Sequence, residues 1–182
     1  DNPLIHQGLS GGRLPGLDVE LNTAFEGGLV LLGYNLVDEV VSADDVARVD
    51  LYWTTWEPPR GRYQRTLAVL DGDGLRWSHR DTAAPRDFRS PPQTWAWPPG
   101  TFAQDSHEVA LIAGTQPGVY DLELTLFEHD SLRPMRVLEP EGRAGGPSLA
   151  IGLLRVARPV HPVDPQSMTM QYRLDLELGS LM

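Results

Sequence analysis

Apolar and polar residues alternate along much of the chain, and a period of two predicts half-buried β-strands. The clearest run covers residues 119–126, where Tyr120 starts an apolar row and Asp121 lies in the polar row between its members. Residues 28–59 supply two further strands joined by an acidic loop, and the other strands are expected to pack on the same core. The pattern predicts strands over 17–25, 29–36, 47–53, 63–70, 75–81, 108–112, 119–126, 136–139, 149–156 and 168–178.

Turn residues separate these runs. Asp71-Gly72-Asp73-Gly74 is a strong hairpin signal, because glycine adopts the positive φ angles that a tight turn needs. Tyr120 follows a Pro-Gly turn, a placement typical of the tyrosine corner of immunoglobulin-like sandwiches. A Pro-rich segment, 82–106, is expected to pack over the strands as a long connection through Phe88, Trp95 and Trp97. The chain is therefore predicted to be all-β, an antiparallel immunoglobulin/fibronectin-III-like β-sandwich of about seven to nine strands.

The distribution of these patterns divides the chain into three parts. Residues 1–16 are a linker or lead-in, 17–158 form the sandwich, and 159–182 combine a linker with a C-terminal strand. The sequence LDVEL at 17–21 returns as LDLEL at 174–178, each after a linker-like stretch. This similarity predicts that the last strand resembles the start of a following repeat, and that both ends are cuts in a longer polypeptide. Such a strand would pair elsewhere, for example in a homo-oligomer formed through it.

Composition narrows the class of protein. A chain of 182 residues can bury a real core, and no stretch approaches the about 18 apolar residues of a membrane helix. Its formal charge of -10 argues against nucleic acid as a partner, since phosphates need a basic face. The absence of cysteine excludes disulfides and thiol-based sites.

The sequence contains short matches to catalytic and metal-binding motifs, but the residues around them do not fit those motifs. The sequence GLSGG at 8–12 matches a nucleophile elbow, but Pro15 and Gly16 follow where that motif needs a helix. Glu128-His129-Asp130 is better interpreted as a solvated strand end than as a metal site, because adjacent strand residues do not share a face. No catalytic, cofactor-binding or metal-binding residue is assigned, no cofactor is expected, and the protein is predicted not to be an enzyme.

The five tryptophans are the residues with a binding character. Alternation places Trp53 and Trp77 in the core. Trp56, Trp95 and Tyr52 are the candidates for exposure, and flat exposed aromatics can form a platform for pyranose rings. The competing interpretation is that aromatics in Pro-rich loops pin those loops to the sandwich.

Five short motifs, in order along the chain, resemble a known module. They are LLGYNL at 31–36, VDLYW at 49–53, LDGDG at 70–74, WPPG at 97–100 and PGVYDL at 117–122. Together they are similar to the β-sandwich module of bacterial membrane glycosyltransferases of the dolichyl-phosphate-mannose–protein mannosyltransferase-like family. The likeness spans about residues 17–158 and departs from the module at 82–93 and 139–147.

That resemblance implies an extracytoplasmic, non-catalytic accessory domain on the bacterial cell membrane, with the membrane portion of its own parent protein as partner. Catalysis would belong to that membrane portion. Two alternatives stay open: a carbohydrate-binding module that uses Trp56, Trp95 or Tyr52, and a homotypic assembly domain that uses the C-terminal strand.

Overall fold

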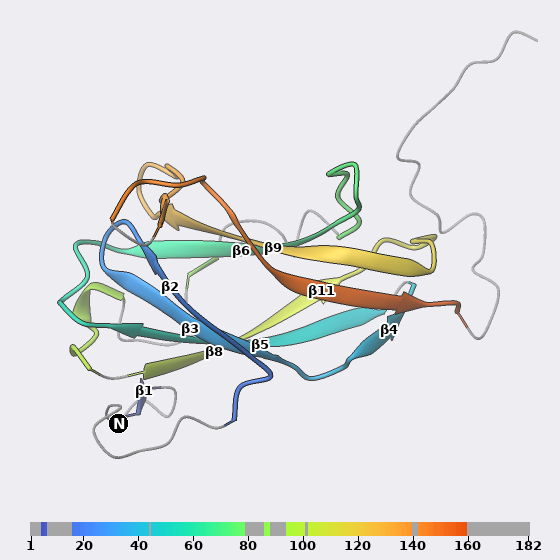
Figure 1. The fold of residues 1–182 in the computed structure, drawn as a ribbon, viewed down its shortest axis with the longest axis horizontal. Coiled ribbons are helices and arrows are strands. Elements are labelled where there is room, and N and C mark those ends of the chain that lie inside the picture. The colour runs from blue at the N-terminus through green and yellow to red at the C-terminus, as the bar shows by residue number, and fades with distance from the viewer. Residues whose placement is uncertain are drawn as a thin grey trace, which may run out of the picture.

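The computed structural model describes residues 5–6, 16–43, 45–78, 86–87, 94–100, 102–139 and 142–159. Within them the chain is all-β and forms two stacked sheets (Figure 1). The only helical segment in these ranges is one 3₁₀ turn, η1 (Thr94–Ala96). The described part of the chain has no helix long and apolar enough to cross a membrane.

The two sheets have six and five strands. The first runs in the order β1 (Ile5–His6), β8 (Phe102–Ala110), β5 (Val46–Thr55), β3 (Leu29–Leu36), β2 (Val19–Phe25), β10 (Val137–Leu138). The second runs in the order β4 (Val40–Ser42), β11 (Leu149–Ala157), β9 (Gly118–Glu128), β6 (Tyr63–Leu70), β7 (Arg86–Asp87). Neighbouring strands are antiparallel except β4 and β11, which are parallel. The predicted fold class, an antiparallel β-sandwich, is confirmed.

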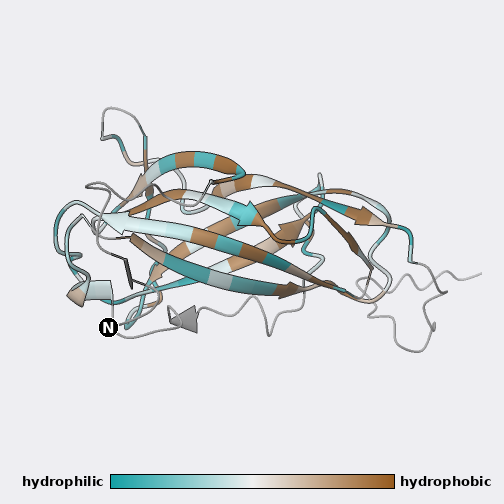
Figure 2. Cartoon of the chain, turned by 90° about the horizontal axis from the view of Figure 1, so that it is seen from below, coloured by the Kyte–Doolittle hydropathy of each residue, from teal (hydrophilic) through white to brown (hydrophobic). Residues whose placement is uncertain are grey.

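Alternation along the strands builds the core. On β9, Leu122, Leu124 and Leu126 are fully buried, while the residues between them are partly exposed. Figure 2 shows the same alternation as brown and teal bands along the long strands. Trp53 is buried in the core, as predicted, and Trp77 packs against it from a partly exposed position.

Two local predictions are confirmed by hydrogen bonds. The Tyr120 hydroxyl donates to the carbonyl oxygen of Gln116 at 2.7 Å, which is a tyrosine corner. At the hairpin turn, the Gly74 N–H donates to the Asp71 carbonyl oxygen at 2.9 Å, and Gly74 has a φ of 78°. The Trp77 indole N–H also donates to the Asp71 carboxylate at 2.7 Å and is the main reason that the pKa of Asp71 is lowered.

A buried ion pair joins the two sheets. Arg65 on β6 donates through Nε and Nη2 to the two carboxylate oxygens of Asp105 on β8, each at 2.5 Å. Both side chains are almost completely removed from solvent. Paired, bidentate geometry of this kind is what allows two charges to be buried together.

The observed strands differ from the predicted ones at several boundaries. β8 starts at Phe102, inside the segment predicted as a Pro-rich connection, and β4 was not predicted. Within residues 75–78, the described part of the strand predicted at 75–81, the structure has isolated bridges at Arg76 and Ser78. The lead-in also contributes β1, which pairs with β8. The predicted strand at 168–178 lies outside the described residues.

Candidate functional site

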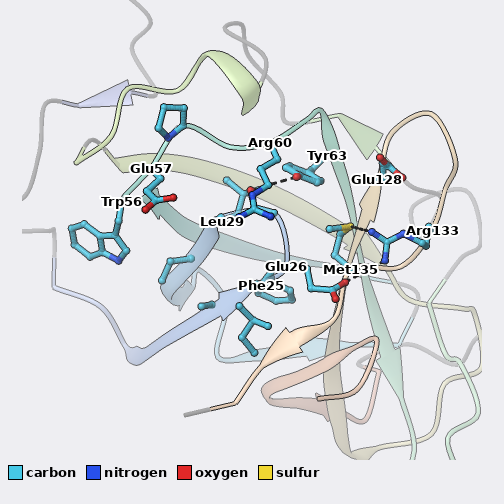
Figure 3. A pocket seen from close by; sticks show the side chains of 16 residues that line it. Phe25, Glu26, Leu29, Trp56, Glu57, Arg60, Tyr63, Glu128, Arg133 and Met135 are labelled. Carbon is cyan, nitrogen blue, oxygen red and sulfur yellow. Dashed lines mark hydrogen bonds and ion pairs between the residues drawn. The ribbon is translucent and has the colours of Figure 1, made fainter. Parts of the chain in front are cut away.

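A pocket of about 690 Å³ opens at the end of the sandwich where β2 turns into β3 (Figure 3). Its lining comes from that turn, the loop between β5 and β6, the end of β9 and the chain leading to β10. The floor is apolar, because Phe25, Leu29 and Met135 are buried core residues. Charged and aromatic side chains form the rim, namely Glu26, Trp56, Glu57, Arg60, Glu128 and Arg133.

The β2–β3 turn depends on two glycines. Gly27 and Gly28 have φ angles of 91° and 95°, in the region that favours glycine. A Cβ atom on Gly27 would lie 2.1 Å from the Tyr63 hydroxyl oxygen, whereas one on Gly28 would meet nothing nearer than 3.9 Å. The turn is therefore packed directly against Tyr63, which forms one wall of the pocket. Burial raises the pKa of the Tyr63 hydroxyl.

The loop that carries Trp56 is anchored on both sides. Before it, the Thr55 hydroxyl donates to the Gly28 carbonyl oxygen at 2.9 Å, and after it the Arg60 N–H donates to the Gly27 carbonyl oxygen at 3.1 Å. Buried Thr94 in η1 adds support, accepting from the Tyr63 N–H and donating to the Gly61 carbonyl oxygen, both at 3.0 Å. These bonds hold the rim of the pocket to the sandwich.

Three of the charged rim residues, Glu26, Glu128 and Arg133, already have partners within the protein. The Glu26 carboxylate accepts from Arg133 Nη1 and from the Arg136 N–H, each at 3.2 Å. The hydrogen bond from the Arg136 N–H is the largest cause of the lowered pKa of Glu26, and Arg133 contributes as well. Glu128 accepts from the Ser131 hydroxyl at 2.6 Å. These groups brace the chain between β9 and β10.

Glu57 and Arg60 remain available. Both side chains are exposed, and within the described residues neither forms a hydrogen bond or ion pair with another protein group. In Figure 3 the Trp56 ring lies at the outer edge of the pocket, with Glu57 beside it and Arg60 further along the rim. The pocket thus offers an aromatic face, an acceptor and a donor to a bound molecule.

The three predicted platform residues are not brought together. Trp56 is 60% exposed and lines the pocket, so its predicted exposure is confirmed. Trp95 is 56% exposed, also as predicted, but it lies on η1 and is not among the lining residues. The predicted exposure of Tyr52 is wrong: it is 4% exposed, because Leu32 and Phe102 pack against it on the outer face of the first sheet.

Sequence reasoning missed the polar partners of Trp56. The turn at 26–28 was recognised as a turn, and Arg60 follows two prolines, yet neither feature indicates a shared pocket. Arg133 lies in a loop more than a hundred positions from Glu26, so only the folded chain joins them.

No metal centre is formed by the described residues, among which no group of three His, Cys, Asp or Glu side chains is placed to hold an ion. His129 lies between two charged groups: Nε2 is 3.0 Å from Arg62 Nη2, and Nδ1 is 2.9 Å from an Asp130 carboxylate oxygen.

Comparison with known proteins shows a likeness of fold. No protein-family model and no curated protein matches the sequence. Among solved structures, the C-terminal domain of Wzt matches with a TM-score of 0.51 and 13% identity, over 87% of this chain and 93% of that one. At this identity the likeness concerns the β-rich fold alone. The sequence comparisons add no support for the expected glycosyltransferase-associated family.

Proposed function

We propose that this protein is a non-catalytic carbohydrate-binding accessory domain whose ligand lies in the pocket beside Trp56. The observation that carries the proposal is the combination of an exposed indole with the free side chains of Glu57 and Arg60 above an apolar floor. A sugar ring has an apolar face that stacks on an aromatic ring and hydroxyls that need directed polar groups.

Each part of the pocket has a role in this proposal. Trp56 stacks on the ring, Glu57 accepts hydrogen bonds from hydroxyls, and Arg60 donates to hydroxyl or carbonyl oxygens. The apolar floor receives a methyl or acetyl group, or simply the edge of the ring. Hydrogen bonds to charged groups are stronger than neutral ones, so two such residues can orient a ligand in an open pocket.

The accessory role has separate support. The structural neighbour is itself described as a C-terminal domain, which is a β-domain within a longer protein. By the family resemblance, the parent of the present domain is a bacterial membrane glycosyltransferase with this domain on its extracytoplasmic face. In that setting a sugar pocket would hold or position a glycan near the membrane portion of the parent.

Glycan-array screening followed by calorimetric titration tests the proposal. We expect binding to at least one class of bacterial surface glycan, and at least tenfold weaker binding by Trp56→Ala. Trp95→Ala is the matched control, since it removes an equally exposed indole outside the pocket lining, and it should retain binding within about twofold.

Two results would overturn the proposal. One is the absence of binding to every glycan by correctly folded wild-type protein. The other is binding that Trp56→Ala leaves unchanged, because the ligand would then lie elsewhere.

A further inference from the structure

Exposed apolar side chains gather at the end of the sandwich opposite the pocket. Val40 on β4, Val119 on β9 and Leu153 on β11 are between 49% and 58% exposed. They line one hollow of about 450 Å³. Val40 and Val119 are both in register with Arg155, so β4, β11 and β9 place Val40, Arg155 and Val119 in one row on one face of the second sheet, and Leu153 lies two residues from Arg155 along β11. We call Val40, Val119 and Leu153 the apolar patch.

The patch borders the β4 edge of the second sheet. β4 is the last strand of its sheet and pairs, among the described residues, with β11 alone. An end strand leaves backbone N–H and C=O groups open to a further chain. Single exposed apolar residues are common, but several together beside a sheet edge indicate a contact surface.

The charges around the patch indicate what covers it. Glu39 and Arg155 line the same hollow, yet within the described residues neither side chain forms a hydrogen bond or an ion pair. Arg155 lies on the middle strand between Val40 and Val119, and Glu39 directly precedes Val40, so the hollow carries one charge of each sign. Such a pair of opposite charges is self-complementary under a twofold axis. In such a dimer Glu39 of each copy faces Arg155 of the other copy, so the contact forms two times.

We propose that a second copy of this chain packs on the apolar patch as an isologous dimer. Glu39 of each copy pairs with Arg155 of the other, and the two patches bury each other's valine and leucine side chains. This dimer is independent of the proposed sugar binding. Because the pocket is at the other end of the sandwich, the dimer leaves both pockets open.

Sedimentation velocity of the 182-residue chain over a wide concentration range tests the dimer. We expect a reversible monomer–dimer equilibrium that Leu153→Asp weakens at least tenfold. Leu132→Asp is the matched control, because Leu132 is 52% exposed in the loop after β9, away from the patch. It should leave the equilibrium within about twofold, as surface changes outside an interface usually do.

Exchanging the charges of Glu39 and Arg155 tests whether these two residues pair across the proposed dimer. Glu39→Arg alone and Arg155→Glu alone each place like charges opposite one another, so both should shift to monomer. An equimolar mixture should recover the dimer, since in the mixed pair both contacts are again attractive. The double variant should recover it as well.

Several outcomes would overturn the proposal. These are a monomeric wild type at all concentrations, a dimer unaffected by Leu153→Asp and by the single exchanges, or a mixture that stays monomeric. A dimer that persists in all these variants but is lost on deleting residues 166–182 would place the contact in the C-terminal segment instead.

Discussion

The two ends of the sandwich present opposite kinds of surface. One end has the pocket, with charged and aromatic side chains supplied by turns and loops. The other has the apolar patch, with valine and leucine supplied by strands. Val119 and Glu128 mark these ends on β9, and nine steps along a strand separate them by about 30 Å. In Figure 1 the β2–β3 turn and β4 accordingly lie at opposite ends.

This difference follows from how each end is built. Loops can bring residues from distant segments into a concave surface, and binding sites are commonly made that way. Strand faces are flatter and suit contact with another protein. The proposed sugar site and the proposed dimer contact can therefore share one core, because they lie at opposite ends of it.

The largest expected effect comes from breaking the buried ion pair that joins the two sheets on which both ends are built. Asp105→Ala leaves Arg65 as a buried charge without its carboxylate, which costs about 3–5 kcal/mol of unfolding free energy. Chemical denaturation should show both ends losing structure in a single transition. Asp73→Ala, in the exposed hairpin turn, should change stability by less than about 0.5 kcal/mol. A loss below about 1 kcal/mol for Asp105→Ala would contradict a structural role for the pair.

A smaller loss of stability is expected from substituting the two glycines of the β2–β3 turn at the pocket end. Gly27→Ala adds a Cβ atom against the Tyr63 hydroxyl at a positive φ, whereas Gly28→Ala shares the positive φ but makes only ordinary van der Waals contacts, the nearest at 3.9 Å. Gly28→Ala should cost about 1–2 kcal/mol from backbone strain alone. Gly27→Ala should cost clearly more in thermal or chemical unfolding and should also weaken glycan binding. Equal costs for the two variants would mean that the turn can move away from Tyr63.

Removing one tyrosine hydroxyl at each end compares how much the two hydrogen bonds contribute to stability. Tyr120→Phe removes the 2.7 Å tyrosine-corner bond near the β4 end and should cost about 1 kcal/mol. Tyr63→Phe removes a 3.4 Å bond to Gly27 at the pocket end and should cost less, because hydrogen bonds weaken with length. Denaturation of both variants under one set of conditions measures the difference. A greater loss for Tyr63→Phe would reverse this order.

The smallest expected effect is the pH-dependent contribution of Glu26 to the stability of the folded protein. The pKa of Glu26 is lowered in the folded protein, chiefly by the Arg136 N–H and further by Arg133. A lowered folded-state pKa contributes stability above the unfolded-state pKa, and that contribution is lost as pH falls through the folded-state value. Wild type should therefore exceed Glu26→Gln in stability at neutral pH, and the gap should close on acidification below the ordinary glutamate range. A gap that persists in acid would contradict the ion-pair origin.

The sequence predicted most of the strands because their signals are local. Alternation of apolar and polar residues placed β3 and β6 at their observed boundaries and β9 within two residues of its ends. The same logic failed where pairing is non-local. β4 has three residues and is defined by its parallel pairing with β11, more than a hundred positions later.

Side-chain environment was harder to predict than strand position. Asp105 is buried within β8 because Arg65 on the other sheet pairs with its charge. Arg65 lies 40 positions away in the sequence, and no local pattern predicts the pairing. Tyr52 has the parity of an outward residue and does point outward, but Leu32 and Phe102 cover it. The pocket joins four separate segments, so Trp56 could be proposed from sequence while its partners could not.

We propose that the two ends of the sandwich differ in what they bind, and chemical-shift mapping by NMR tests this difference most directly. A glycan selected on the array is titrated into ¹⁵N-labelled wild-type protein. We predict that the shifts concentrate on the Trp56 indole N–H and on the amides of Gly27, Gly28 and Arg60. Val119 and Leu153 should stay unchanged. Shifts centred on the apolar patch or on the Trp95 indole, with the Trp56 signal unmoved, would contradict the account.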